Sequence, residues 1–225
     1  MKIIEDAKKR GADNLSEFES KQVLSNYGIP VTRETTATTM EETVSAANSI
    51  GYPVVLKASG ENLQHKTELN LIRLDLKDAS QVRQAYTELL ETSTTPITEV
   101  LVQQMLRGNR ELLAGLKRDS QFGPCVVFGL GGILAEILED VSIRVAPITT
   151  FDAMDMMENI RGKKILEPFR GKPPVDRNAL AELLIAIGRI GLENDAVAEI
   201  DINPIKLIEG QPVAVDALVV LDNIS

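Results

Sequence analysis

Three strand-like apolar stretches follow one another in the middle of this chain with no helical pattern between them. They are Glu99–Met105, Glu111–Lys117 and Pro124–Phe128. Strand-like and helical patterns interleave over the rest of the sequence. Strands that adjoin directly favour mixed or antiparallel sheets with helices on their faces over a purely parallel, doubly wound sheet. We therefore expect an α+β or α/β protein.

Helix starts can be read from capping residues. Ser16 with Glu19 matches a capping box, and Thr39 with Glu42 has the same spacing. Further helices are expected after Asp78 and Asp176, where apolar residues recur at helical spacing. The polar stretch 92–96, which ends in proline, suggests a change of lobe.

Charge and cysteine content restrict the possible partners and the environment. The net charge is −9 and the pI about 4.8, which disfavours binding to nucleic acid and to anionic membranes. The single cysteine excludes an internal disulfide and a thiolate metal site. No apolar run approaches the ~18 residues of a membrane span, and the first residues lack a signal-like apolar region. We expect a cytoplasmic protein.

A polar stripe occupies the strand-like segment 199–204. Strict alternation places Glu199, Asp201 and Asn203 on one face and isoleucines on the other. Gly210 indicates a hairpin turn. A hairpin centred before Gly210 would set Asn203 opposite Asp216, about 5 Å apart at Cβ.

These faces carry no lysine or arginine, and oxygen ligands of this kind suit Mg²⁺. A bulge at Pro204 or Pro212 would break the register. The alternative interpretation is the solvated polar face of an edge hairpin.

Three further features are candidates for phosphate chemistry. Lys57 ends an apolar strand and could contact phosphate oxygens, or lie at the sheet edge with its charge in water. His65, the single histidine, lies on a polar loop and is either an inert surface residue or a nucleophile toward a phosphoryl group. Gly131 and Gly132 follow a strand and would admit an anion to the backbone, or form a plain turn.

In order along the chain, these segments resemble the nucleotide-binding β subunit of ADP-forming acyl-CoA synthetases, members of the ATP-grasp superfamily related to succinyl-CoA synthetase. The resemblance covers nearly the whole chain. It rests on the segments 27–31, 51–57, 65–68, 100–105, 117–124, 128–132, 144–147, 199–204 and 214–217.

The resemblance implies an ATP-grasp fold, with nucleotide held between two lobes of mixed and antiparallel sheets flanked by helices. The smaller lobe would comprise residues 31–98, and the larger lobe 1–30 plus 99–225. The implied site residues are Lys57 for phosphate, Gln103, Gln104 and Met105 for adenine, Glu111, Gly131 and Gly132 for ribose or phosphate, Asn203 and Asp216 for Mg²⁺, Asp201 beside the reacting phosphoryl group, and His65 as its acceptor.

The implied activity is that of an acid–thiol ligase, which interconverts acyl-CoA, ADP and phosphate with carboxylate, CoA and ATP through a phosphohistidine. It would require a CoA-binding α subunit or a fused domain. The family usually has two glycines after the His-Lys-Thr-acidic stretch, whereas this chain has Leu69 and Asn70. That departure leaves open a regulatory nucleotide-sensing domain of an acyltransferase-type protein. A ligase that forms an acyl phosphate is the third alternative, and it would not need His65.

Overall fold

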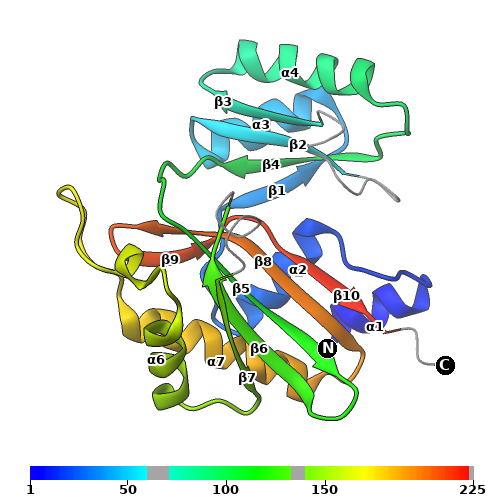
Figure 1. The fold of residues 1–225 in the computed structure, drawn as a ribbon. Helices are drawn as coiled ribbons and strands as arrows, with labels where there is room; N and C mark the ends of the chain where they lie inside the picture. Colours follow the sequence, from blue (N-terminus) through cyan, green and yellow to red (C-terminus); the bar gives the residue numbers. More distant parts are fainter. Residues whose placement is uncertain (60–70, 133–139, 223–225) are drawn as a thin grey trace. The chain divides into compact units, whose positions relative to one another are not determined.

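The computed structural model describes residues 1–59, 71–132 and 140–222. The chain forms two compact units, one of residues Thr32–Leu106 and one of Met1–Val31 with Arg107–Ser225 (Figure 1). The change of unit therefore follows Leu106 rather than the polar stretch 92–96. The reason is that Glu99–Gln104 is an inner strand of the smaller unit's sheet, so the polar stretch only links a helix to that strand.

The larger unit is built on an antiparallel sheet with the strand order β10-β8-β5-β6-β7, and β9 pairs with β8. The strands β8 and β5 lie inside this sheet, while β7 is at its edge. Their bounds are β5 Glu111–Asp119, β6 Gly123–Leu130, β7 Val141–Val145, β8 Val197–Ile208, β9 Gln211–Ala214 and β10 Leu218–Leu221.

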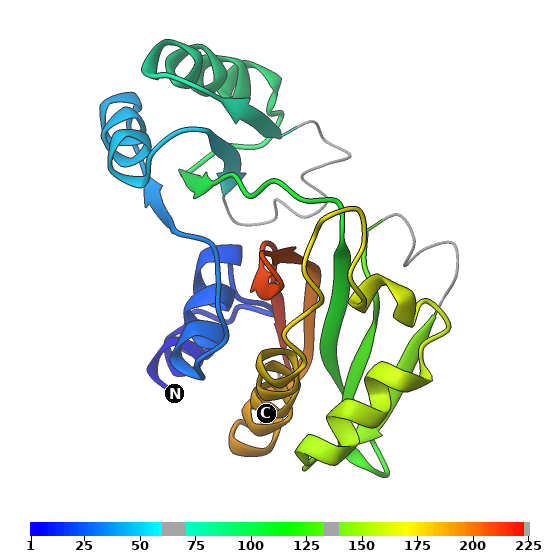
Figure 2. The ribbon, with the colours of Figure 1, turned by 90° about the vertical axis from the view of Figure 1, so that its left-hand side faces the viewer.

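Helices cover this sheet and share one apolar core with it. Helix α7 contacts β5, β6 and β8, helix α6 contacts β7, and helix α2 contacts β10 (Figures 1 and 2). The largest fully buried side chains of this core include Phe128, Leu116 and Met156. The helices are α1 Lys2–Lys9, α2 Glu17–Asn26, α6 Thr150–Asn159, the 3-10 helix η1 Lys163–Leu166 and α7 Arg177–Glu193.

The smaller unit has a four-stranded antiparallel sheet in the order β1-β4-β2-β3. Both of its helices pack on one face of this sheet (Figure 2), where the apolar residues of alternate strand positions form a separate core. The elements are β1 Glu34–Ala37, α3 Met40–Ile50, β2 Val54–Ser59, β3 Ile72–Leu76, α4 Ala79–Thr92 and β4 Glu99–Gln104.

The predicted helix starts are confirmed by hydrogen bonds. Ser16 and Glu19 form the reciprocal capping box of α2, and the side chains of Thr39, Asp78 and Asp176 cap α3, α4 and α7. Helix α1, strand β1 and helix α6 are not predicted by the local sequence patterns. Helix α6 also begins with a capping box, formed by Thr149 and Asp152, in which aspartate replaces the usual glutamate. No helix in the described part of the chain is long and apolar enough to cross a bilayer.

Candidate functional site

Strand β8 has the alternation that its sequence predicts. Ile200 and Ile202 are buried at 2% and 0% exposure, whereas Glu199 and Asp201 face the other side and remain partly exposed. The strand pairs with β5 on one side and with β10 on the other, so it is central. The alternative of an edge hairpin is therefore wrong.

The register predicted for the hairpin is present on both sides of Asn203. Ile205 faces Ala214 in the ladder of β8 with β9, and Asp201 faces Leu218 in the ladder of β8 with β10. Both pairs belong to the register that would set Asn203 opposite Asp216. These two residues lie in the interruption between the ladders, after a last hydrogen bond of 3.0 Å from the Val215 N–H to the Pro204 carbonyl.

A bulge in β8 changes which side chains share the acidic face. Against β5 the register shifts by one residue, because Ala114 faces Ile202 while Leu112 faces Ile205. Ile205 and Leu207 are consequently buried, and Lys206 joins the face that carries Asp201. Its Nζ lies 3.4 Å from Oε1 of Glu111.

The expectation that these faces carry no lysine or arginine is therefore wrong. Lys206 reaches the face through the bulge, and Lys117 of β5 stands opposite Glu199 in the ladder. The alternation of odd and even positions along the strand could not place Lys206 on this face, because one extra residue in a strand reverses the face of every later side chain. Pro204 was the available signal, since proline within a sheet favours bulges.

The two glycines after β6 form a tight junction with Glu111 and Asn203. The Gly132 N–H donates to Oδ1 of Asn203 at 3.1 Å, and the Gly131 N–H donates to the Glu111 carbonyl at 2.9 Å. A Cβ atom on Gly131 would lie 2.4 Å from the Leu112 carbonyl oxygen, and one on Gly132 would lie 2.2 Å from Oε2 of Glu111. Gly131 therefore requires glycine for the close approach of the Leu112 backbone, whereas Gly132 is favoured as glycine by its positive φ of 61°.

Negative charge accumulates around Asp201. Burial first, and then the nearby charges of Glu199 and Asp216, together raise the pKa of this carboxyl to about 6. A bound cation would relieve this repulsion. Within the described ranges, no three His, Cys, Asp or Glu side chains form a metal-binding group. The donor set for a cation here is thus a few oxygens, to be completed by a ligand or water, as is usual for Mg²⁺.

The smaller unit places Lys57 and Gln103 on the same face of its sheet. In the ladder of β2 with β4, Lys57 faces Leu101 and Val55 faces Gln103. The side chains of alternate residues, such as Leu56 and Val102, point into the core under the helices, so Lys57 and Gln103 lie on the opposite face. Both are buried, at 5% and 1% exposure.

Gln104 is the last residue of β4 and Met105 follows it, and the amide hydrogens of both are already engaged. The Gln104 N–H donates to the Arg33 carbonyl at 2.8 Å, and the Met105 N–H donates to the Pro53 carbonyl at 3.1 Å. The side chain of Gln104 accepts from Nε of Arg33 at 3.2 Å, and Sδ of Met105 accepts from the Asp75 N–H at 3.2 Å. The backbone groups with which these two residues could contact a purine are therefore their carbonyl groups. His65 lies outside the described residues.

An ATP-grasp domain family matches residues 6–221. The chain is 41% identical to the β subunit of acetate–CoA ligase [ADP-forming] I from Pyrococcus furiosus, covering 97% of this chain and 96% of that one. It is 38% identical to acetate–CoA ligase [ADP-forming] I from Archaeoglobus fulgidus over 90% of this chain, but spans only 30% of that longer protein.

A solved structure is similar over the whole fold. It is an acetyl-coenzyme A synthetase of Ca. Korarchaeum cryptofilum in complex with coenzyme A and Mg-AMPPCP, in which a phosphohistidine segment points towards the nucleotide-binding site. The match has a TM-score of 0.88 and 41% identity, and it covers 98% of this chain and 99% of the other. With the two antiparallel sheets and their helix layers described above, these similarities show that the chain belongs to the ATP-grasp family, in the group of β subunits of ADP-forming acetate–CoA ligases.

Proposed function

We propose that this chain is the nucleotide-binding subunit of an ADP-forming acyl-CoA synthetase, which converts acyl-CoA, ADP and phosphate into carboxylate, CoA and ATP through a phosphohistidine. The observation that carries the proposal is the concentration of oxygen donors on β8 and after β9, where burial and like charge raise the pKa of Asp201. Clustered like charges destabilise a protein, and a bound cation would offset that repulsion.

Asn203 and Asp216 would hold Mg²⁺. Asn203 Oδ1 already accepts the Gly132 N–H, but an amide oxygen has a second lone pair for a metal. Asp201, two residues before Asn203 on the same strand, would lie beside the reacting phosphoryl group. When bound, the metal neutralises charge on the phosphate oxygens.

The remaining residues would position the nucleotide. Lys57 would contact phosphate oxygens as a buried cation, and the carbonyl groups of Gln103 to Met105 would accept from the adenine amino group. Glu111 would receive ribose or phosphate-side contacts, held in place by Lys206. Gly131 and Gly132 would let the backbone approach the ligand closely.

His65 would accept the phosphoryl group. A neutral ring nitrogen of the imidazole forms a bond to the γ-phosphorus while the bond to the β–γ bridging oxygen breaks, and ADP leaves with that oxygen. The chain contains one histidine, so phosphohistidine on this subunit can form only there.

A CoA-binding α subunit, or a fused domain, would complete the enzyme. The fused arrangement has a parallel in the Archaeoglobus fulgidus relative, of which this chain spans 30%. Such an enzyme would act in the cytoplasm, where its nucleotide and CoA substrates are available.

The test supplies the partner subunit, γ-labelled ATP and Mg²⁺, and measures acid-labile, base-stable label on this chain. We expect label on the wild type and on Lys66→Ala, and none on His65→Ala. Calorimetry should also show micromolar MgADP binding with a raised melting temperature. Nucleotide binding without label on the wild type would instead support a nucleotide-sensing domain or an acyl-phosphate ligase.

A further inference from the structure

The larger unit contains a cavity of about 350 Å³ that is lined by cations. Two arginines and two lysines line it, and no acidic residue does. The lining residues are Asn109, Arg110, Lys164, Ile165, Phe169, Arg170 and Lys172. The volume falls in the range of small-molecule pockets, which begins at about 300 Å³. In a chain of net charge −9, such a concentration of positive charge stands out.

Arg110 is the buried member of this set, with 6% exposure. Among the described residues its guanidinium donates to carbonyl groups alone, those of Ile165 and Glu167 at 3.4 Å and that of Pro173 at 2.8 Å. Its Nε is buried and has no hydrogen-bond partner within the described ranges. A buried cation without a counter-ion is costly, so an anion in the cavity would stabilise it.

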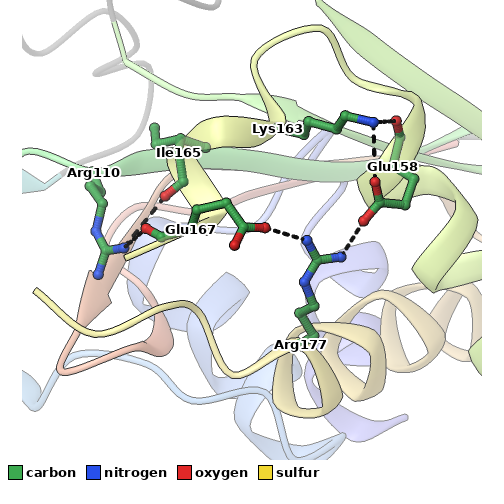
Figure 3. A network of polar contacts seen from close by, with 6 residues as sticks. All are labelled: Arg110, Glu158, Lys163, Ile165, Glu167 and Arg177. Atoms are coloured by element: carbon green, nitrogen blue, oxygen red, sulfur yellow. Dashed lines mark hydrogen bonds and ion pairs between the residues drawn. The ribbon is translucent and has the colours of Figure 1, made fainter. Parts of the chain in front are cut away.

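The nearby carboxylates are engaged elsewhere (Figure 3). The carboxylate of Glu167 turns to Arg177 at 2.9 Å, although its carbonyl accepts from Arg110. Glu158 accepts from Arg177 at 2.6 Å and from Lys163 at 3.1 Å. The neighbouring acids thus neutralise Arg177 and Lys163 and leave the cavity cations to another partner.

The other cavity cations have no acidic partner among the described residues either. Nζ of Lys172 donates to the Asn109 side-chain oxygen at 2.8 Å. The guanidinium of Arg170 lies 5.1 Å from the centre of the Phe169 ring. Lys164 is exposed and makes no ion pair with any described residue.

A tight turn presents Arg170 and Lys172. Phe169 and Lys172 exchange both backbone hydrogen bonds, at 3.2 and 3.0 Å. The two residues between them have positive φ, 47° for Arg170 and 76° for Gly171. A left-handed conformation is unfavourable for arginine, so the fold holds this side chain in place at an energetic cost.

Arg110 of the cavity and Glu111 of the proposed nucleotide site lie on opposite faces of the larger unit's sheet. Arg110 directly precedes Glu111, the first residue of β5, so their side chains point to opposite faces. Arg110 is on the face of Leu112 and Ala114, which belongs to the core under the helices, and Glu111 is on the face of Lys206.

We propose that this cavity binds a small molecule with at least two linked phosphate groups. Arginine forks match phosphate oxygens, and lysines add point charge around them. Phe169 and Ile165 give the cavity apolar wall, which an organic group attached to the phosphates would contact. This site does not depend on the proposed function.

The test is calorimetry in EDTA, so that metal-dependent nucleotide binding does not contribute. The probes are orthophosphate, pyrophosphate, ADP and CoA. We expect submillimolar binding of pyrophosphate and weaker binding of orthophosphate. Tighter binding of ADP or CoA that is weakened by Lys164→Gln supports the proposal and identifies an organic diphosphate as the ligand, while equal affinity supports it with inorganic diphosphate as the recognised group.

The matched variants are Lys164→Gln and Lys163→Gln, neighbouring exposed lysines of η1 with the same change of charge. Lys164→Gln should weaken pyrophosphate binding about tenfold. Lys163→Gln, whose lysine pairs with Glu158, should stay within about twofold of the wild type. An equal effect of the two substitutions, or no heat with millimolar pyrophosphate on the wild type, overturns the proposal.

Discussion

Two carboxylates of the larger unit stand in opposite electrostatic environments. Glu17 is 6% exposed at its side chain and lies 3.0 Å from Nζ of Lys21, which is 1% exposed, one turn along the same helix. Asp201 is partly buried beside Glu199 and Asp216, and the pKa of its carboxyl rises to about 6. In the first case the chain itself provides the counter-ion. In the second we infer that a ligand does.

The comparison separates charges that maintain the fold from charges that serve binding. A buried charge with a partner in the same helix is satisfied as soon as the helix forms and packs. Charges that repel one another weaken the ligand-free protein and gain further compensation when a cation binds. The cations around Arg110 resemble Asp201 with the opposite sign of charge, since we propose that a bound ligand supplies their counter-ion.

The largest effect is expected from breaking the buried pair. Lys21→Met leaves Glu17 buried without its helical partner and should lower the free energy of unfolding by about 3 kcal/mol. Glu17→Gln combined with Lys21→Met should recover most of this loss, because neither charge remains. Urea unfolding measures both variants.

Lys9→Met is the matched control, since Lys9 pairs with Asp6 at 3.4 Å but is 75% exposed. It should change the free energy of unfolding by no more than about 0.5 kcal/mol. A comparable loss in the two single variants would show that burial does not distinguish these pairs.

The next largest effect is expected on nucleotide binding, from a change at Asp216 beside Asp201. Asp216→Ala should weaken binding of MgADP about 100-fold, which is about 2.8 kcal/mol, because a proposed metal ligand is lost. Binding of ADP in EDTA should match that of the wild type, and the melting temperature should change little. Asp195→Ala, an exposed acid in the turn before β8, is the control. Equal weakening with and without metal would assign Asp216 a structural role.

The smallest effect is a gain of stability. In the metal-free protein, Asp201→Asn should raise the free energy of unfolding by about 1–2 kcal/mol near pH 8, since it removes a repelled charge. The raised pKa fixes the sign. Between about pH 4 and pH 6 the folded state holds a proton that the unfolded state has released, so wild-type stability falls as pH rises through this window.

Denaturant titrations of the metal-free protein across this pH window check the prediction. The advantage of Asp201→Asn should be absent near pH 4, where the carboxyl is protonated in both states, and complete above about pH 6. It should shrink when Mg²⁺ and nucleotide are added, because the bound cation relieves the same repulsion. A gain that does not depend on pH would contradict this explanation.

Much of the fold was predictable from local signals. The caps at Ser16, Thr39, Asp78 and Asp176 require only a side chain and an amide three residues away, and all four were found. Helix α6 was not predicted because its capping box has aspartate in place of the usual glutamate. The boundary between the units was not predictable from composition, since whether β4 belongs to one sheet or the other depends on its pairing with β1 and β2.

The sequence by itself determined the alternation of β8, the register of its hairpin and the family. Each of these is a pattern of residue types over a short stretch, or an ordered set of such stretches. Only the tertiary structure decided that Lys206 joins the acidic face, because the bulge that turns it there arises from pairing with β5. Only the tertiary structure brought Arg110 to Lys164 and the turn 169–172, because packing assembles those residues into one cavity across more than fifty positions of the chain. Periodicity and capping act over a few residues, whereas this convergence depends on how distant elements pack.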